Sequence, residues 1–328
     1  MSGTIVVRPA SLLSMLEADV NPILSIGVLH GGRCPDEPAF VVSEENGGVH
    51  SRVAATLRYI ERLHRMRPAA QGPARDRTLT LFQAEDAPRD AEGVSWQAKT
   101  AWTGVRLVPD LYYFTNDGYE RFLPPGLYDL PPWERRKDIA VWRGSTSGML
   151  GLTSSSIETL PRVRLCRLMH SLGLNCDAAI TGVVQAVSED EKASIEAMLV
   201  SERLLKDFVS LREMGFYKLV IDIDGNASSW NFLAKLKLGS CVVKVESDWC
   251  QWFTARLMPW RHYVPVTADL ADLGEKLDWC FSHDEEAEQI AQAGREFALG
   301  FSLDRELAKA SRTIFQAPAS PGSERQET

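Results

Sequence analysis

The sequence predicts an α/β protein whose second half forms a parallel, doubly wound sheet. From about residue 139 onward, short apolar segments with strand character alternate with segments of helical periodicity, which is typical of such sheets. The chain has 328 residues, which is long for one domain and sufficient for two. Its composition, with 45% hydrophobic and 24% charged residues, is that of a globular protein. We therefore expect two domains, each with its own core.

The first half contains few clear elements. Apolar residues recur at steps of three and four from Ser51 to Met66, which predicts an amphipathic helix. Strands are expected over "TLTLF" (78–82) and over "LYYFT" (111–115), which the turn signal Asn116-Asp117-Gly118 closes. The Pro-rich segment "FLPPGLYDLPPWERRKD" is expected to be irregular and to link the two domains.

The second half alternates between strands and helices. We expect strands over "IAVWRG", "FYKLVIDI", "CVVKVES" and "HYVPV". We expect helices over "RVRLCRLMHSLG", "DEKASIEAMLVSERLLKDFVSL", "SSWNFLAKLKLG", "WCQWFTARL" and the region after Leu270. In sheets of this kind, ligands bind at the carboxyl ends of the strands, beside helix N-termini.

Charge and cysteine content exclude several classes of protein. The net charge of -8, from 36 basic and 44 acidic residues, argues against binding nucleic acid by bulk electrostatics. The N-terminal residues lack the features of a secretory signal, and no apolar run is long enough for a membrane span. Neither the six cysteines nor the six histidines show the spacing of a metal site. We therefore expect a cytoplasmic protein with reduced thiols.

The stretch "VIDIDGN" allows three interpretations of Asp222 and Asp224. Asp222 can be the nucleophile of a Mg-dependent phosphohydrolase that resembles the haloacid dehalogenases, but the acidic pair such a fold needs downstream is missing. The two carboxylates can also be a metal-binding Asp-x-Asp pair that holds a diphosphate. In the third interpretation a strand ends in a turn of Gly225 and small residues, whose backbone N–H groups bind phosphate at a helix N-terminus.

A second loop favours the third interpretation. "VWRGSTSG" is again a strand followed by glycine and hydroxyl side chains, and the basic residues Arg162, Arg164 and Arg167 follow it. Hydroxyls and backbone amides donate to phosphate oxygens, and a guanidinium can bind them with two parallel hydrogen bonds. Two such loops in one sheet indicate a nucleoside diphosphate site.

Six segments taken together resemble a known family. They are "WRGSTSG", "PRVRL", "YKLVIDIDGNASSW", "VVKVESDWCQWF", "LMPWRHYVPV" and "DWCFSHDEEAEQIAQAGREF". In this order they are similar to the protein O-glucosyltransferases and capsule-associated xylosyltransferases, glycosyltransferase family 90. The match runs from about residue 79 to 297 and is strongest in the second half. Without a secretory signal or retention sequence, the chain resembles the bacterial, cytosolic branch.

The resemblance implies a GT-B fold, with two Rossmann-like domains facing a central cleft, and an inverting, metal-independent reaction. It implies a UDP-sugar donor held mainly by the C-terminal domain and no other cofactor. The matching general base is Asp86, preceded by Glu85, in "LTLFQAEDAP". A carboxylate suits this role, because a base must take the proton of the acceptor hydroxyl as that oxygen attacks. Tyr113 and Asp117 are further candidates for the acceptor or sugar side.

The donor-binding residues are assigned by the same resemblance. Family members often carry an arginine where this chain has Asn231, and Arg164 or Lys235 can replace that cation. Asp224 is expected to cap or orient its turn, and Glu246 to accept hydrogen bonds from the ribose. The full predicted donor set is Arg143, Gly144, Ser145, Thr146, Arg162, Arg164, Asp224, Gly225, Asn226, Ala227, Ser228, Ser229, Asn231 and Glu246.

These inferences combine into one predicted function. Residues 1–120 form an acceptor-side domain with the base, residues 121–300 bind the UDP-sugar, and residues 301–328 hold a helix that returns to the first domain and a tail. The acceptor is a glycan or lipid-linked glycan of surface polysaccharide or lipopolysaccharide synthesis. We expect no nucleic-acid partner and a peripheral contact with the inner membrane surface. Two alternatives stay open: the phosphohydrolase that uses Asp222, and a nucleotide-sugar-binding protein of the same fold without turnover.

Overall fold

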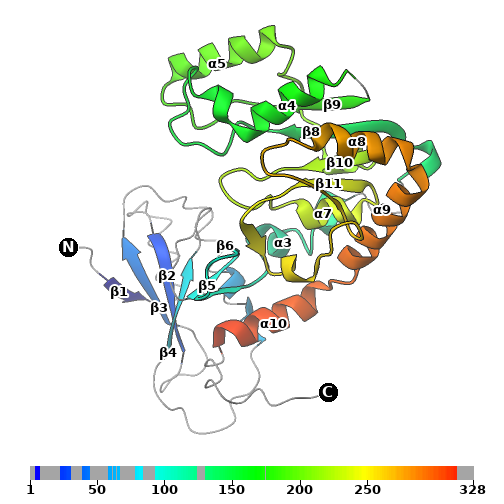
Figure 1. Ribbon diagram of the computed structural model, residues 1–328. Coiled ribbons are helices and arrows are strands. Elements are labelled where there is room, and N and C mark those ends of the chain that lie inside the picture. Colours follow the sequence, from blue (N-terminus) through cyan, green and yellow to red (C-terminus); the bar gives the residue numbers. More distant parts are fainter. Residues whose placement is uncertain are drawn as a thin grey trace. The chain divides into compact units, whose positions relative to one another are not determined.

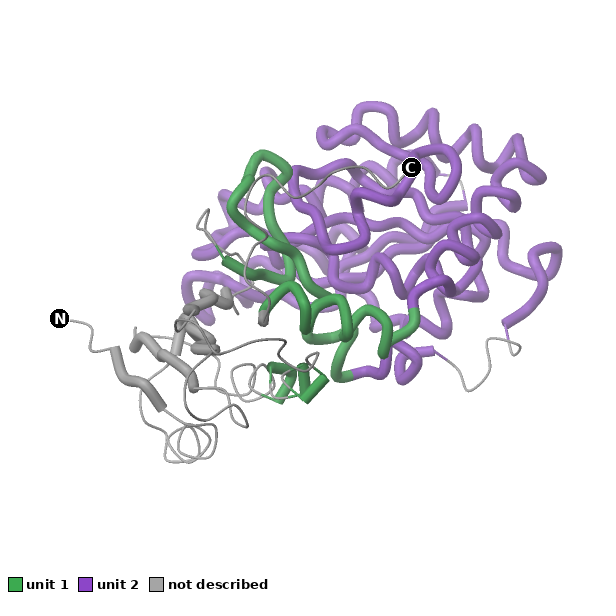
Figure 2. The backbone as a smooth tube through the Cα atoms, turned by 90° about the horizontal axis from the view of Figure 1, so that it is seen from below, with its two compact units in different colours: residues 1–115, 302–328 green, residues 116–301 purple. Residues whose placement is uncertain are grey.

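The fold was examined in a computed structural model. The structure describes residues 4–7, 23–30, 39–44, 58–60, 62–63, 65–66, 78–83, 93–123, 130–173 and 175–315. The chain divides into two compact units, one of residues 1–115 and 302–328 and one of residues 116–301 (Figure 2). Nothing in the described helices is long and apolar enough to cross a membrane.

The second unit is built on a five-stranded parallel sheet (Figure 1). Its strands lie in the order β13-β11-β10-β8-β9, and every neighbouring pair is parallel. The predicted α/β class is therefore confirmed in this unit. The strand bounds are β8 Lys137–Gly144, β9 Cys176–Ile180, β10 Tyr217–Asp222, β11 Cys241–Val245 and β13 Val264–Val266, with the short β12 Trp249–Gln251 outside this sheet.

Helices of the second unit follow most of these strands. Each of two begins with a serine cap, since Ser188 Oγ accepts from the Glu191 N–H and Ser210 forms a reciprocal capping box with Glu213. The helices are α4 Pro161–Ser171, α5 Glu189–Ser201, α6 Leu211–Met214, α7 Phe232–Lys237, α8 Leu273–Ser282 and α9 Asp284–Leu299. Single 3-10 turns lie at Glu120–Phe122, Trp133–Arg135, Ile157–Thr159 and Thr254–Arg256.

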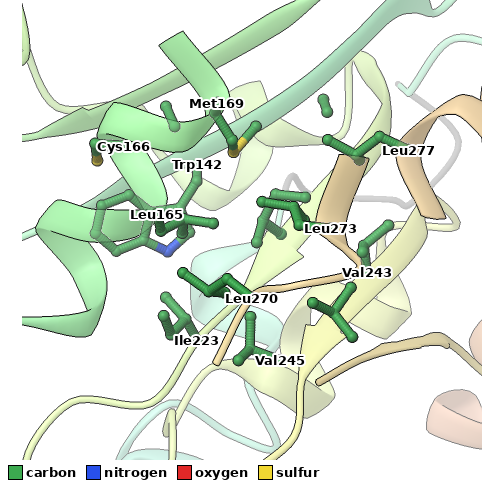
Figure 3. Close-up of a cluster of buried hydrophobic side chains, with 14 of the residues drawn as sticks. Trp142, Leu165, Cys166, Met169, Ile223, Val243, Val245, Leu270, Leu273 and Leu277 are labelled. Carbon is green, nitrogen blue, oxygen red and sulfur yellow. The ribbon is translucent and has the colours of Figure 1, made fainter. Parts of the chain in front are cut away.

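One hydrophobic cluster joins the sheet to its helices. Figure 3 shows Trp142 of β8 and Val243 of β11 gathered with Leu165 of α4 and Leu273 of α8. Side chains alternate between the two faces of a strand, so Ile221 and Ile223 belong to this cluster whereas Asp222 points to the opposite face. This alternation decides where the charged groups of the candidate site lie.

The first unit contains a sheet of mixed direction in the order β1-β3-β2-β4-β5-β7. The pairs from β1 to β4 are antiparallel, and β4/β5 and β5/β7 are parallel. Its C-terminal helix α10, Leu303–Phe315, belongs to the same unit, and Ser311 Oγ donates to the Leu63 carbonyl at 2.7 Å. The other elements are β1 Thr4–Val7, β2 Ile23–His30, β3 Ala39–Glu44, β4 Thr78–Gln83, β5 Gly93–Ser95, β6 Gln97–Lys99, β7 Val105–Leu107 and α3 Leu111–Thr115.

Three expected elements differ from the structure. "LYYFT" is the short helix α3, because Asp110 caps it by accepting from the Tyr113 N–H at 2.9 Å. "WCQWFTARL" holds β12 and a 3-10 turn instead of a helix, and the helix expected over 190–211 ends at Ser201. The strand β9 was not predicted at all. It is only five residues long and begins with Cys176-Asp177, which leaves little apolar pattern to detect.

Candidate functional site

The candidate site lies where two neighbouring strands of the parallel sheet end. The chain leaves β8 toward β9 on one side, and then returns to place β10 on the other side of β8, with β11 and β13 beyond it. The order therefore reverses between β8 and β10, and such a switch point is where open α/β sheets bind ligands. Val220 of β10 lies level with Val141 of β8, so both strands end at the same edge. We call the following turns the Gly144 loop (144–148) and the Asp224 loop (223–231).

Arg162, near the N-terminus of α4, joins the two loops. Its guanidinium donates to the carbonyl of Asp224 at 3.0 Å, the carbonyl of Ile223 at 3.4 Å, the carbonyl of Ser145 at 3.2 Å and the hydroxyl of Ser147 at 2.5 Å. Burial lowers the pKa of Arg162, while the negative charges of Asp222 and Asp224 oppose this shift. These bonds use four of the five N–H donors of an arginine and leave one on Nη2.

The loops touch one another at glycines. A Cβ on Gly225 would lie 2.8 Å from both Arg162 Nη2 and Ser147 Oγ, and one on Gly148 would lie 3.6 Å from the Gly225 carbonyl oxygen. Gly148 also has a φ of +131°, which side chains rarely tolerate. Gly225 therefore allows the close approach of the two loops, whereas Gly148 is favoured by its backbone conformation.

The Gly144 loop is held mainly by neutral hydrogen bonds. Thr146 is fully buried, and its Oγ1 donates to the carbonyl of Val184 at 3.0 Å and accepts from the Val184 N–H at 2.8 Å. The Gly148 N–H donates to the Gln185 side chain at 3.2 Å. Thr146 is thus a connection to the segment after β9, a structural role, whereas the side chain of Ser145 makes no such bond within the described part of the chain.

Arg143 does not extend toward the loops. Its guanidinium binds the Asp177 carboxylate at 2.8 Å and the carbonyls of Trp142, Asp177 and Asp207 at 2.9, 2.7 and 3.2 Å. Its side chain is only 5% exposed. This geometry favours a structural role in joining β8 to β9 over the predicted contact with a donor.

The Asp224 loop rests on buried charges. Asp222 is fully buried, and its two carboxylate oxygens accept from Lys235 at 2.7 Å and from Lys244 at 2.9 Å. Burial alone raises the pKa of this carboxyl, but the two ammonium groups outweigh burial and hold the pKa well below its usual range. Lys244 also binds Asp224 Oδ1 at 3.1 Å, and both carboxylates raise its pKa.

Serines complete this loop. Ser229 Oγ donates to Asp222 at 2.7 Å, and the Ser229 N–H donates to Asp224 Oδ1 at 2.8 Å. Asp224 therefore orients its turn by accepting from the loop backbone, the role expected for it. Asp224 Oδ2 and Ser228 Oγ are buried and have no hydrogen-bond partner anywhere in the described ranges. Buried polar groups are rarely left in this state, so both atoms are candidates to meet a ligand or an ordered water.

The remaining predicted donor residues are spread around these loops. Gly144 and Asn226 are partly exposed and Ala227 is buried. Asn231 Oδ1 lies 2.9 Å from Ser229 Oγ, and Arg164 donates to the carbonyl of Asp269 at 3.1 Å. Glu246 is exposed just after the end of β11. Lys235, expected as a replacement cation, instead forms an ion pair with Asp222.

Of the four predicted acceptor-side residues, the structure describes Tyr113 and Asp117. Glu85 and the expected base Asp86 lie outside the described residues. Tyr113 is fully buried in α3, and Asp117 forms an exposed ion pair with Arg121 at 2.7 Å.

Two residues of the site were missed by the sequence interpretation. Lys244 was not considered, although it faces Asp222 directly across the β10/β11 pair. An ionic residue between apolar ones in a buried strand was the signal that could have revealed it. Ser147 was noted only as part of the hydroxyl turn, and yet its Oγ is the hydroxyl that Arg162 binds.

The geometry bears directly on the two metal interpretations. No cluster of three or more His, Cys, Asp or Glu side chains suited to a metal occurs among the described residues. Three of the four carboxylate oxygens of Asp222 and Asp224 accept from protein groups, and lysine ammonium groups contact all three. Asp222 is neither exposed nor unpaired, so it is poorly suited to attack a phosphate ester.

Comparison with known proteins gives a consistent match. The model of Glycosyl transferase family 90 matches residues 128–304. Protein O-glucosyltransferase 2 of Danio rerio is 34% identical over 168 residues, which cover 51% of this chain and 30% of that protein. Protein O-glucosyltransferase 1 of Rattus norvegicus is 28% identical over 208 residues, which cover 63% of this chain and 48% of that protein. The chain thus spans less than half the length of these curated relatives.

Solved structures show only a remote likeness. The crystal structure of Anabaena Alr3699/HepE in complex with UDP-glucose superposes with a TM-score of 0.38 at 11% identity, covering 53% of this chain and 48% of that one. A similarity at this level carries no argument about fold or ligand.

Proposed function

The chain belongs to glycosyltransferase family 90, and we propose that it transfers glucose, xylose or a related sugar from a UDP-sugar to a hydroxyl of an acceptor. The proposal includes inversion at the anomeric carbon, no metal ion and a GT-B arrangement of the two units. It includes a glycan or lipid-linked glycan as acceptor, in surface polysaccharide or lipopolysaccharide synthesis. It places the reaction in the cytoplasm, at or near the membrane face.

One observation carries the proposal. Two glycine-containing loops meet at the switch point of a parallel sheet, and the buried Arg162 joins them. Backbone N–H groups and a guanidinium at that place suit the diphosphate of a nucleotide sugar. The predicted donor residues Ser145, Gly225 and Asn226 all belong to these loops.

The charges of the site suit a departing diphosphate. Lys235, Lys244 and Arg162 carry three positive charges, and Asp222 and Asp224 carry two negative ones, which leaves an excess of one. As the sugar is transferred, UDP gains negative charge, and groups already fixed in place can stabilise it without reorganising. This excess of positive charge supports a reaction in which protein groups stabilise the departing diphosphate, as a metal ion does in other transferases.

The proposed base is Asp86, three residues after β4 ends at Gln83. Its role rests on the resemblance of "LTLFQAEDAP" to the family pattern. A carboxylate there would take the proton of the acceptor hydroxyl as the hydroxyl oxygen attacks the anomeric carbon.

Calorimetric titration with UDP and UDP-glucose, each with and without EDTA, tests donor binding. We expect binding that EDTA does not weaken. Release of UDP in the presence of an acceptor then tests turnover, with Asp86→Asn compared with Glu85→Gln as the matched neighbour. Asp86→Asn is expected to lower kcat by about 10²-fold or more while leaving UDP affinity unchanged.

Three results would contradict parts of this proposal. Binding that requires magnesium would contradict the metal-free site, and full activity of Asp86→Asn would contradict the base. UDP binding without any UDP release would favour a binding protein without turnover. Asn231, a neutral residue where family members often carry arginine, is the observation that keeps this second candidate in view.

A further inference from the structure

The segment 116–123, which we call the strap, follows directly after the boundary of the first unit. Three successive residues in it have left-handed backbones: Asp117 with φ 49°, Gly118 with φ 72° and Tyr119 with φ 72°. Glycine adopts this conformation freely, but for a tyrosine it is strained. Such strain persists only where surrounding contacts hold the backbone in place.

Tyr119 makes these contacts with the Asp224 loop. It is fully buried, and its hydroxyl donates to the carbonyl oxygen of Trp230 at 2.6 Å. The ring centroids of Phe122 and Trp230 lie 5.1 Å apart, and that of Tyr119 lies 6.2 Å from Trp230. Tyr119 thus contacts Trp230 in two ways, through a hydrogen bond to its backbone and through a contact between the two rings.

A buried lysine fixes the strap from the other side. Lys237 of α7 is 3% exposed, and its ammonium donates to the carbonyl of Gly118 at 2.8 Å and to the Glu120 carboxylate at 2.7 Å. Helix α7 starts at Phe232, directly after the Asp224 loop. The strap is therefore attached both to the loop and to the helix that continues from it.

Besides the buried charges beneath it, the Asp224 loop is held at both ends. Arg162 holds the carbonyls of Ile223 and Asp224 at its beginning, and Tyr119 holds the carbonyl of Trp230 near its end. Between these points lie Gly225, Asn226 and the Ser228 hydroxyl, which has no hydrogen-bond partner among the residues that the structure describes.

We propose that Tyr119 is a positioning residue of the donor site, which fixes the Asp224 loop from the segment that begins the second unit. As a deepening of the proposed function, this inference assumes that the loop binds the donor. Tyr119 acts through the Trp230 backbone and need not touch the donor itself. The first segment of the second unit thereby sets the conformation of a donor-binding loop in the same unit.

The first test compares two buried tyrosines that each donate to a backbone carbonyl. Tyr119→Phe removes the hydroxyl at the loop, and Tyr59→Phe removes an equally buried hydroxyl that donates to the Pro109 carbonyl at 3.0 Å in the other unit. Titration with UDP separates the Kd from the binding-competent fraction. We expect Tyr119→Phe to raise the Kd about three- to tenfold and Tyr59→Phe to leave it unchanged. A purely structural role would reduce the competent fraction and leave the Kd of the folded protein as it was.

A second pair of variants tests the strap without altering a buried residue. Glu120→Gln weakens the bond to Lys237, and Asp284→Asn weakens a similar pair with Lys218 at 2.6 Å. Both carboxylates are about half exposed, so both variants should fold. We expect a smaller rise in the Kd, about twofold, for Glu120→Gln alone.

Amide hydrogen exchange, measured without any nucleotide, distinguishes failure of this inference from failure of the proposed function. Tyr119→Phe should speed exchange in residues 224–231 and leave residues 144–148 unchanged. If the wild-type protein did not bind UDP but this exchange pattern held, the donor function would be wrong and the positioning role correct. Wild-type exchange in 224–231, together with a wild-type Kd where UDP binds, would overturn the inference.

Discussion

The two loops at the end of the parallel sheet are alike in sequence but differ in what holds them. Apart from two hydrogen bonds from Arg162, the Gly144 loop depends on a buried hydroxyl, Thr146, that exchanges neutral hydrogen bonds with Val184. The Asp224 loop depends on Asp222 and its two lysines, of which Asp222 and Lys235 are buried and Lys244 is 15% exposed. Neutral hydrogen bonds contribute little each and are insensitive to pH, whereas buried ions are costly to separate and respond to protonation. The same kind of turn is thus stabilised by two different kinds of interaction.

The largest expected effect comes from Asp222→Asn. It leaves Lys235 buried without its counter-charge and Lys244 with Asp224 alone, and breaking a buried pair in this way costs about 3–5 kcal/mol. Denaturant unfolding measures the loss. Asp177→Asn is the matched control, since Asp177 also binds two cations but is 26% exposed. If both variants lost the same stability, burial would not be what distinguishes the Asp224 loop.

The second effect is on the pH dependence of stability. The folded protein holds the pKa of Asp222 below its unfolded value of about 3.9. Its contribution is therefore complete above that value and is lost as the pH falls through the folded pKa. As the pH is lowered from 7 to 3, the free energy of unfolding should fall less steeply in Asp222→Asn than in the wild type. An unchanged pH profile would show that the carboxylate is not what the lysines stabilise.

A smaller effect is expected from Thr146→Val in the Gly144 loop. The change removes both hydrogen bonds and leaves the Val184 N–H unpaired, at a cost of about 1–3 kcal/mol. The loss should not vary between pH 7 and pH 4, because no charge is involved. Thr159→Val, which removes one exposed hydroxyl contact to the Ser156 carbonyl, is the control and should cost less.

The smallest effect is expected from Arg164→Gln. Its guanidinium makes one exposed hydrogen bond, to the Asp269 carbonyl, so stability should change by no more than about 0.5 kcal/mol. The measurement that matters is the Kd for UDP. A large rise in this Kd with unchanged stability would show that Arg164 supplies the cation missing at Asn231, and would extend the donor site beyond the two loops.

Much of this architecture was predictable from the sequence because it follows local patterns. The strands that end in the two loops are short apolar runs bounded by glycine, and α4 follows helical periodicity from Pro161. The meeting of the loops was predictable as well, since parallel strands of one sheet share a carboxyl edge.

The partners of the charged residues were not predictable in the same way. Arg143 precedes the Gly144 loop and Arg162 follows it, but only Arg162 connects the two loops, while Arg143 pairs with Asp177 of the unpredicted strand β9. Lys244 meets Asp222 only because β11 lies beside β10, a long-range pairing that periodicity does not reveal. Of the strap, only the turn at Asn116-Asp117-Gly118 was predicted, and its contacts with the Trp230 carbonyl and with Lys237 follow from long-range packing that the sequence does not reveal.

The first unit is formed by two segments that lie far apart in the sequence. This affects the order in which the two units fold during synthesis. Residues 116–301 form a continuous unit, but the other unit includes α10, where Ser311 binds the Leu63 carbonyl and Arg106 binds the Thr313 carbonyl. During synthesis, domains usually fold in the order in which they leave the ribosome. Here the N-terminal residues must wait for nearly the whole chain to emerge, so the second unit can complete its fold first. A ribosome stalled shortly after residue 301 has emerged would therefore carry a folded second unit and an unfinished first one.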